Sequence, residues 1–368
     1  MKMFSRKPLL VLILILAIAF IYTSLPRAWY EKSTYGTELP QSALLPPVVK
    51  NNLSKFILDT AQNAQAVVIL HDEKIVLEVG DTEKLINCHS ARKSIMSLLI
   101  GIAKEKGFLT LNETLGVLGI DESKMPLTPQ EKSATIRDLL MARSGVYLPA
   151  EAETDFAKAH RPKREQYKPG EFFFYNNFDF NVLGAILEKK TGKTIGEFME
   201  KYLAEPLGMQ EFAPSNIVYG NPWPVRSDNS DYRVYWMYLS ARDFARVGEL
   251  VAQKGKWNNK QIVSAQWIEE STKMYTDSLD ESMWPFDGYS YLWWLDKDNN
   301  TIWADGYGGQ FLLIDAARNL VLSQRNFTGN SLITSGLFQL KKKRDGSRRQ
   351  LMYVYDHMKN FISGTSGN

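Results

Sequence analysis

The pattern of apolar and polar positions predicts strands near both ends of the main domain. Residues 66–80, AVVILHDEKIVLEVG, form two β-type runs around a polar turn, which is typical of a hairpin. Residues 289–326 contain further short runs rich in aromatic and β-branched residues, separated by the polar turns DKDNN and ARN. Because a hairpin and a meander can join edge to edge, we expect one antiparallel sheet of about five strands.

Helical spacing of apolar residues dominates the chain between these two regions. The long insert at about residues 108–215 is mostly helical in pattern, with glycine stops at Gly145 and Gly192. The pattern also predicts helices outside the insert, at residues 52–65, 88–107, 240–255 and 347–362. The sequence therefore predicts an α+β fold in which the first and last helices flank the sheet.

The N-terminus has the features of an export segment. Lys2, Arg6 and Lys7 precede an apolar run over about residues 8–25, whose length lies between that of a signal peptide and that of a full membrane span. We expect a membrane anchor or signal segment at 1–30, a Pro-rich linker at 31–50 and the folded domain at 51–368. The expected location is the bacterial cell envelope. The catalytic domain would be exported and anchored to the inner membrane, or periplasmic or secreted if the leader is cleaved.

Composition excludes several other classes of function. A net charge of +3 in 368 residues is too small to predict nucleic acid as a partner, and the basic run at 341–349 is expected to be a surface loop. The single cysteine, Cys88, excludes an internal disulfide and is expected to be a small buried hydrophobe. Because metal-binding and nucleotide-binding motifs are absent, no metal and no cofactor is predicted.

One pair of residues carries candidate chemistry. Ser90 and Lys93 lie one turn apart at the start of the 88–107 segment, which reads as an amphipathic helix. A lysine is unusual there, because the positive end of a helix favours acids. Either the pair is an ordinary polar first turn, or Lys93 is buried, neutral and able to take a proton from the Ser90 hydroxyl. His89 is a poor base for Ser90, since neighbouring helical side chains diverge by about 100°.

Several segments in collinear order resemble the serine β-lactamase and penicillin-recognising family. The resemblance covers roughly residues 50–362 and is closest to the class C and DD-peptidase-like branch, which includes esterases and 6-aminohexanoate-dimer hydrolases. It rests on HSARKSIMSLLIGIAKEKG, TIRDLLMARSGV, KPGEFFFYNNFDFNVLGAILEKKTG and YLSARDFARVGELVAQKGKWNNKQIV. It implies a β-lactamase/transpeptidase-like fold and cleavage of a small-molecule or peptide-like amide or ester through an acyl-serine.

The resemblance also implies roles for individual residues. Ser90 would be the nucleophile, Lys93 and Tyr175 would move protons, and Asn177 would hold the substrate amide or the lysine. Two other sequences match the second motif of the family, Tyr219-Gly220-Asn221 and Ser227-Asp228-Asn229. We prefer Tyr175-Asn176-Asn177, which follows a Pro-Gly turn and leads directly into a helix.

The third motif departs from the family pattern. Tyr307, Gly308 and Gly309 stand where a lysine or histidine usually begins the motif, and the N–H of Gln310 is expected to be the second oxyanion donor. Tyr307 offers no cation to a penicillin-type carboxylate, which disfavours the alternative of a β-lactamase or D-alanyl-D-alanine carboxypeptidase. A non-catalytic, membrane-tethered wall-binding or sensor protein is the other alternative. No functional role is predicted for four other charged residues. Arg92 is expected on an exposed helix face, and Glu151, Glu153 and Asp155 are expected in a solvated acidic stretch.

Overall fold

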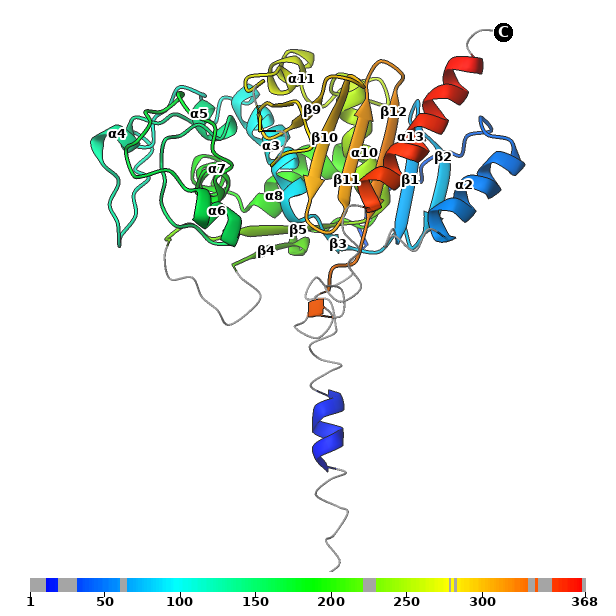
Figure 1. Ribbon diagram of the computed structural model, residues 1–368, viewed down its shortest axis with the longest axis horizontal. Helices are drawn as coiled ribbons and strands as arrows, with labels where there is room; N and C mark the ends of the chain where they lie inside the picture. Colours follow the sequence, from blue (N-terminus) through cyan, green and yellow to red (C-terminus); the bar gives the residue numbers. More distant parts are fainter. Residues whose placement is uncertain are drawn as a thin grey trace, which may run out of the picture.

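A seven-stranded antiparallel sheet forms the centre of the computed structural model (Figure 1). The structure describes residues 11–18, 32–59, 65–220, 230–277, 279–280, 283–329, 335–336 and 346–365. The strand order is β2-β1-β12-β11-β10-β9-β8. The strands are β1 (Ala66–His71), β2 (Lys74–Gly80), β8 (Gly288–Tyr289), β9 (Trp294–Asp296), β10 (Thr301–Gly306), β11 (Gln310–Asp315) and β12 (Leu320–Arg325).

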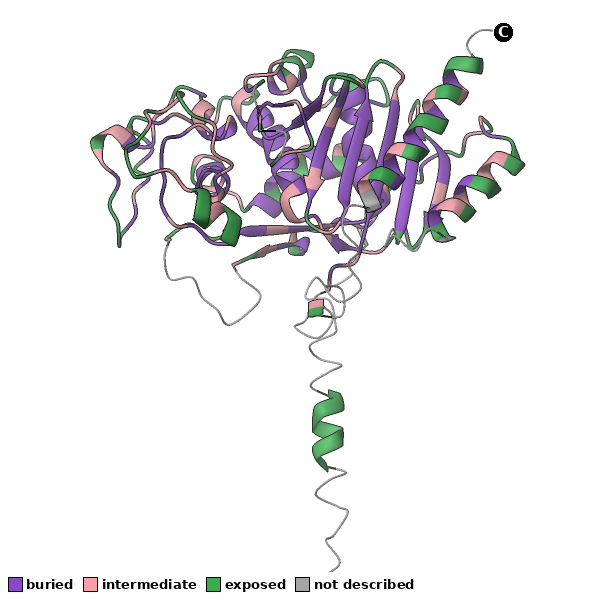
Figure 2. Ribbon diagram, viewed as in Figure 1, coloured by how far each residue is buried: buried purple, intermediate pink, exposed green. Residues whose placement is uncertain are grey.

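The predicted hairpin and meander do join in one sheet, through the pairing of β1 with β12. The sheet has seven strands rather than about five. The additional edge strand β8 is only two residues long, too short for a period-2 pattern to be visible in the sequence. Every residue of β11 and β12 is buried, because helices cover the sheet on both faces (Figure 2).

Helices α2 (Pro47–Asp59) and α13 (Gly346–Thr365) lie on one face, as predicted for the first and last helices of the domain. Helix α10 (Ala241–Ala252) packs against β1, β11 and β12 on the other face, with α3 (Arg92–Glu105) beside it. The segment containing α3 reads as amphipathic, but its apolar continuation at 94–103 indicates a buried helix. The structure buries α3 continuously from Arg92 to Ala103, because β10, α7 (Asn177–Thr191) and α11 (Ala265–Thr272) enclose it.

Short helices and loops make up the region between α3 and the second sheet. The second sheet has the order β3-β5-β4. The remaining elements are β3 (Ile86–Asn87), η1 (His89–Ala91), α4 (Pro129–Lys132), α5 (Ile136–Leu140), α6 (Asp155–His160), α8 (Ile195–Met199), η2 (Glu200–Ala204), α9 (Glu205–Leu207), η3 (Pro214–Asn216), β4 (Ile217–Tyr219), β5 (Tyr235–Leu239), β6 (Lys256–Trp257) and β7 (Lys260–Gln261).

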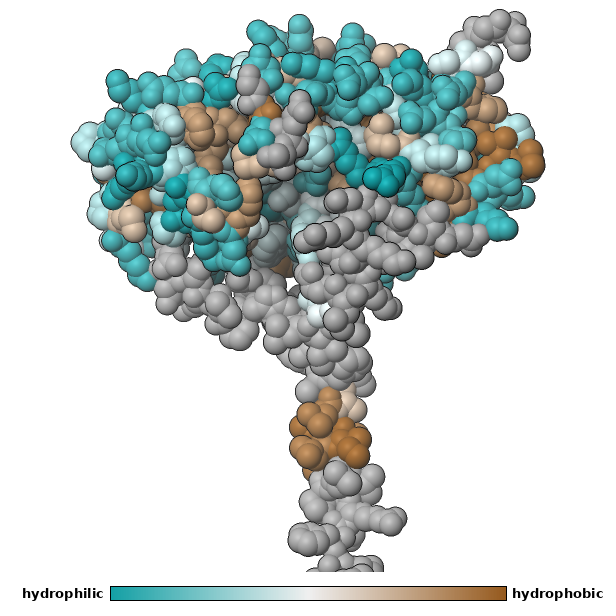
Figure 3. All heavy atoms as spheres, viewed as in Figure 1, coloured by the Kyte–Doolittle hydropathy of each residue, from teal (hydrophilic) through white to brown (hydrophobic). Residues whose placement is uncertain are grey.

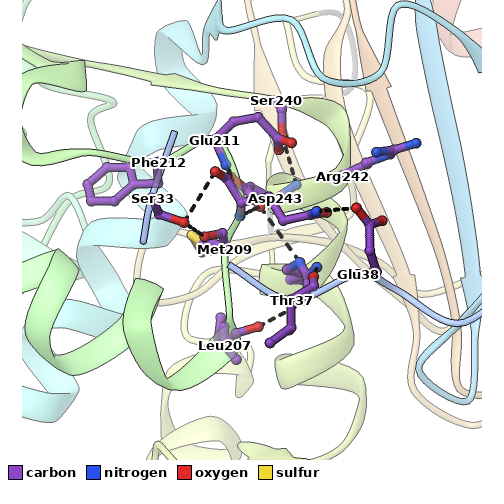
Figure 4. A network of polar contacts seen from close by, with 12 residues as sticks. Ser33, Thr37, Glu38, Leu207, Met209, Glu211, Phe212, Ser240, Arg242 and Asp243 are labelled. Atoms are coloured by element: carbon purple, nitrogen blue, oxygen red, sulfur yellow. Dashed lines mark hydrogen bonds and ion pairs between the residues drawn. The ribbon is translucent and has the colours of Figure 1, made fainter. Parts of the chain in front are cut away.

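The segment at 32–46, within the predicted linker, packs against the domain (Figure 4). The Ser33 N–H donates to Gln210 O and the Thr37 N–H to Gly208 O, each at 3.0 Å. Below this segment lies a buried acidic pair, Glu211 and Asp243. The two carboxylates of Asp243 and Glu211 accept hydrogen bonds from backbone N–H groups and from Ser240, so the pair ties α10 to the chain before η3.

The predicted N-terminal export segment lies largely outside the described residues. Residues 11–18 form a helix whose apolar side chains are exposed, seen as the brown cluster in Figure 3. Within the described part of the chain, no helix combines the length and the apolar character needed to cross a membrane. Most of the basic run at 341–349, and most of the loop that contains the Ser227-Asp228-Asn229 match, also lie outside the described residues.

Candidate active site

Ser90 lies in a tight turn at the entrance to helix α3. It is the middle residue of the 3₁₀ turn η1, which the Ala91 N–H closes by donating to Cys88 O at 3.1 Å. His89 has φ 47°, a left-handed conformation that costs free energy for a residue with a side chain. The last residue of β10, Gly306, lies against this turn, and a Cβ there would come within 2.3 Å of Cys88 O. A glycine therefore allows the strand to approach the nucleophile turn.

Lys93 connects the two hydroxyl groups of the candidate site. Its Nζ donates to Ser90 Oγ at 2.9 Å and to Tyr175 Oη at 2.8 Å. The side chain is almost completely buried. Burial, together with the positive charge of the adjacent Arg92, holds the pKa of Lys93 well below its ordinary value. Burial therefore favours the neutral amine, which is the form that a general base for Ser90 requires.

Tyr175 is held at this position by the start of helix α7. Asn176 caps the helix by accepting the Phe178 N–H at 3.1 Å. The buried Asp179 in the first turn accepts the Ser144 hydroxyl at 2.6 Å, so the segment containing Ser144 is tied to the same helix. Burial raises the pKa of the Tyr175 hydroxyl above its ordinary value. Tyr175 is therefore a protonated phenol that can pass a proton to a leaving group.

A cavity of about 640 Å³ opens beside these three residues. Its lining is mostly apolar, and Phe156, Phe172 and Met283 are exposed at its rim. The lining residues include Ser90, Lys93, Tyr175, Asn177, Tyr307, Phe173, Phe174, Trp236 and Trp284. A smaller lobe of about 220 Å³ also contacts Ser90 and Tyr175. Ser90 therefore lies where the two lobes meet.

The remaining predicted site residues fall into two groups, those that line the cavity and those that do not. Asn177 and Tyr307 line the cavity, but the Asn177 amide donates to Ala152 O at 2.5 Å, and Lys93 bonds to Ser90 and Tyr175 instead. Gly308 and Gly309, with φ of 80° and 85°, form the β10–β11 turn and are absent from the cavity lining.

Gln310 also departs from its predicted position. It is fully buried, it pairs with Gly306 in the β10–β11 ladder, and its side chain donates to Asn326 O. It is absent from the lining of both lobes, and the role of its N–H as an oxyanion donor stays a prediction. The β10 terminus at Gly306 and Tyr307 is the part of this hairpin that reaches the site, because Gly306 contacts the nucleophile turn and Tyr307 lines both lobes.

Arg92 was predicted on an exposed helix face, and this prediction is wrong. The side chain is 1% exposed and lies over the rings of Tyr235 and Trp236, with the guanidinium carbon 5.0 and 4.9 Å from the ring centroids. It also donates to His89 O at 2.9 Å. Periodicity did not reveal this burial, because α3 is enclosed on all sides rather than on one face.

The predicted exposure of two acidic residues was also wrong. Glu151 and Glu153 were predicted in a solvated stretch, yet Glu151 is buried and accepts the Val234 N–H, and Glu153 pairs with Arg161. Asp305 was not identified at all, although it lines the smaller lobe together with Ser90. Its position two residues before Tyr307 on a predicted strand was the available signal, since alternate strand residues share a face.

His89 lines the cavity but does not act on Ser90. Its Nε2 is 2.7 Å from Thr328 Oγ1, and its ring packs edge-on against Trp236 and Tyr307. Burial, reinforced by the charge of Arg92, lowers the pKa of His89 to about 3. The imidazole is therefore neutral near pH 7, and its position agrees with the expectation that it is a poor base for Ser90.

Comparison with known proteins identifies the family of this domain. The beta-lactamase family model matches residues 59–324. Among curated proteins, an uncharacterized protein of Alkalihalophilus pseudofirmus is 21% identical over 319 residues, covering 75% of this chain and 90% of that protein. Protein flp of Staphylococcus aureus strain MW2 is 24% identical over 185 residues, or 44% of this chain, and the chain spans only 36% of its length.

Solved structures share the fold at low identity. A Bacillus anthracis protein described as a 6-aminohexanoate-dimer hydrolase has a TM-score of 0.60 at 16% identity, covering 93% of both chains. A family VIII carboxylesterase has a TM-score of 0.57 at 16% identity, covering 83% of this chain and 98% of its own. Because the family model spans most of the chain and the fold agrees with it, this protein belongs to the beta-lactamase family.

Proposed function

We propose that this protein is a serine hydrolase that cleaves an ester or amide through an acyl-serine intermediate. The observation that carries the proposal is the chain of hydrogen bonds from Ser90 through Lys93 to Tyr175 on the wall of a cavity. A hydroxyl nucleophile, a buried amine with a lowered pKa and a second proton carrier are the groups that acyl transfer requires.

In the proposed mechanism, Lys93 takes the Ser90 proton as Ser90 Oγ bonds to the substrate carbonyl carbon. The negative charge that develops on the carbonyl oxygen is stabilised by the Ser90 N–H and, we infer, by backbone at the Gly306–Tyr307 end of β10. Tyr175 gives its proton to the leaving alcohol or amine and is reprotonated from Lys93. Water then attacks the acyl-serine by the reverse sequence of proton transfers, which releases the acid and restores Ser90.

The lining of the cavity favours small substrates that lack a penicillin-type carboxylate. Tyr307 offers no cation to such a group, and the charged residue on the smaller lobe is the acidic Asp305. Arg92 also lines the larger lobe, but it is buried over the rings of Tyr235 and Trp236 and donates to His89 O. We therefore expect p-nitrophenyl esters to be hydrolysed and nitrocefin and D-alanyl-D-alanine peptides to be poor substrates. The 6-aminohexanoate-dimer hydrolase and carboxylesterase names of similar structures agree with this substrate class.

Labelling with a fluorophosphonate tests the proposal. The intact mass of the full-length protein is measured after incubation in the wild type, in Ser90→Ala and in Ser133→Ala, which alters an exposed serine outside the cavity lining. We expect one adduct in the wild type and in Ser133→Ala, and none in Ser90→Ala. A folded wild type that forms no adduct would overturn the proposal and favour a non-catalytic wall-binding or sensor protein.

We also propose that the domain is exported to the cell envelope, on the basis of the basic flank and apolar run at the N-terminus. Alkaline phosphatase fused after residue 50 tests this location, because the enzyme is active only outside the cytoplasm. An active fusion is expected. A fusion that is made in full but stays inactive would contradict export.

A further inference from the structure

The smaller lobe of the cavity combines one carboxylate with several aromatic rings. It is lined by Ser90, Tyr175, Met283, Trp284, Pro285, Phe286, Trp294, Asp305 and Tyr307. The ring of Trp294 packs against Trp284, Phe286 and Tyr175, with centroids 4.8, 5.2 and 5.4 Å apart. Trp294 is 4% exposed and is stacked against Phe286 and Tyr175, so it supports the ring of Trp284, which is only partly buried. A cation is attracted to the negative face of such a ring.

Asp305 is half-buried in this wall, near the end of strand β10. Among the described residues, its carboxylate forms neither a hydrogen bond nor an ion pair. A partly buried carboxylate without such partners is incompletely solvated. A cation of a bound ligand can compensate for this loss by pairing with the carboxylate.

Two basic side chains act on Asp305 without pairing with it. Burial holds the pKa of Lys93 well below its ordinary value, which disfavours the positive charge of this amine beside Asp305. Arg348, from α13, lies 4.1 Å from the Phe286 ring centroid and 4.9 Å from that of Trp303, and it donates to Pro285 O. Its guanidinium is thus occupied by these rings and this carbonyl, and forms no ion pair with Asp305.

We propose that this lobe is a subsite for an ammonium group of the substrate, held between the Asp305 carboxylate and the ring of Trp284. The proposal rests on the proposed hydrolase function, because Ser90 lies between this lobe and the larger apolar lobe. The substrate class is then an ester or amide with an apolar group on one side of the scissile bond and an alkylammonium group on the other.

Paired esters of equal shape test the subsite. We would compare 4-nitrophenyl 5-(trimethylammonio)pentanoate with its neutral isostere, 4-nitrophenyl 6,6-dimethylheptanoate, by the ratio of their kcat/KM values. In the wild type at pH 8 the cationic ester is expected to be preferred at least tenfold. Asp305→Asn should remove most of this preference. The ratio is the readout because Asp305 also acts on Lys93 and so affects both esters alike.

A matched variant controls for a general loss of negative charge. Asp298 is exposed and absent from the lining of both lobes, so Asp298→Asn should keep the wild-type ratio. The preference should also weaken as the pH falls below about 7, because burial raises the pKa of Asp305 to about 7. The other groups facing Asp305 in this range are the amine of Lys93, the phenol of Tyr175 and the guanidinium of Arg348.

Binding without turnover separates this inference from the proposed function. Quenching of tryptophan fluorescence by hexyltrimethylammonium is measured in Ser90→Ala and in Ser90→Ala/Asp305→Asn. Binding that weakens at least tenfold in the double variant supports the subsite, even if no ester is ever hydrolysed. Ester hydrolysis with no preference for the cation, or equal binding to both variants, would overturn the subsite while leaving the hydrolase proposal intact.

Discussion

Two buried clusters of ionisable groups among the described residues differ in their surroundings, because one of them lines the cavity and the other does not. Lys93 lies between Ser90 and Tyr175 on the wall of the larger lobe. Glu211 and Asp243 lie under the 32–46 segment and are bonded to backbone N–H groups and to Ser240 (Figure 4). Burial displaces the pKa of a group in both clusters, lowering that of Lys93 and raising that of Glu211 to about 8.

The difference lies in what surrounds each displaced group. The hydroxyls bonded to Lys93 also line a cavity that can admit a substrate. The acidic pair is enclosed by α10, the 207–211 chain and the 32–46 segment, and it is absent from the lining of both lobes of the cavity. A displaced pKa therefore indicates a buried ionisable group, and access to a cavity is what makes such a group a candidate for chemistry.

The largest expected effect is the loss of catalysis in Lys93→Met. Removing the general base should lower kcat/KM for a p-nitrophenyl ester by about 10³-fold, within the range known for acid–base catalysis. Glu211→Gln is the matched change in the other cluster and should stay within about twofold of the wild type. Steady-state kinetics on both variants, with circular dichroism as a check of folding, make the comparison. Equal losses in the two variants would erase the distinction between the clusters.

Although Lys93→Met should lose activity, its free energy of unfolding should rise. The pKa of Lys93 is lower in the folded state than in the unfolded state, where it is about 10.4, so the unfolded chain binds the extra proton between these values. The lysine therefore destabilises the fold at neutral pH, and this cost fades as the pH rises toward 10. We expect Lys93→Met to gain about 1–3 kcal/mol at pH 7 in urea unfolding. A variant less stable than the wild type would contradict this.

Glu211 should give stability the reverse dependence on pH. Its folded pKa of about 8 lies above the unfolded value, so its contribution to stability is present below about pH 4.3 and is lost as the pH rises through 8. One such proton changes the free energy of unfolding by at most about 1.4 kcal/mol per pH unit. Urea unfolding from pH 5 to 9 should show a smaller decline in Glu211→Gln. An unchanged slope would show that Glu211 does not carry the proton.

The smallest expected effect concerns the tuning of Lys93 by Arg92. The positive charge of Arg92 adds to burial in lowering the pKa of Lys93. In Arg92→Met the acid limb of the kcat/KM profile should therefore move to higher pH, by up to about one unit. Arg92→Lys keeps the charge and should restore the limb. If both variants moved it equally, packing against Tyr235 and Trp236 would be responsible rather than charge.

The sequence alone predicted the α+β fold, the hairpin, the meander and the proximity of Ser90 and Lys93. These depend on local periodicity, since residues three apart on a helix share a face and alternate strand residues share another. It missed the edge strand β8, whose two residues are too few for a pattern. It placed Arg92 on the surface, because the enclosure of α3 depends on β10, α7 and α11, which come from distant parts of the chain.

What only the tertiary structure decided is the environment of each candidate group. The sequence chose Tyr175 among several matches, but the 2.8 Å hydrogen bond to Lys93 depends on how α7 packs against α3. Gln310 and Asp305 lie five residues apart on one predicted hairpin, yet one is sealed in the core and the other lines the cavity beside Ser90. The sequence determines the chemical type of each side chain. Its burial, its partners and its pKa depend on residues remote in the chain, which only folding brings together.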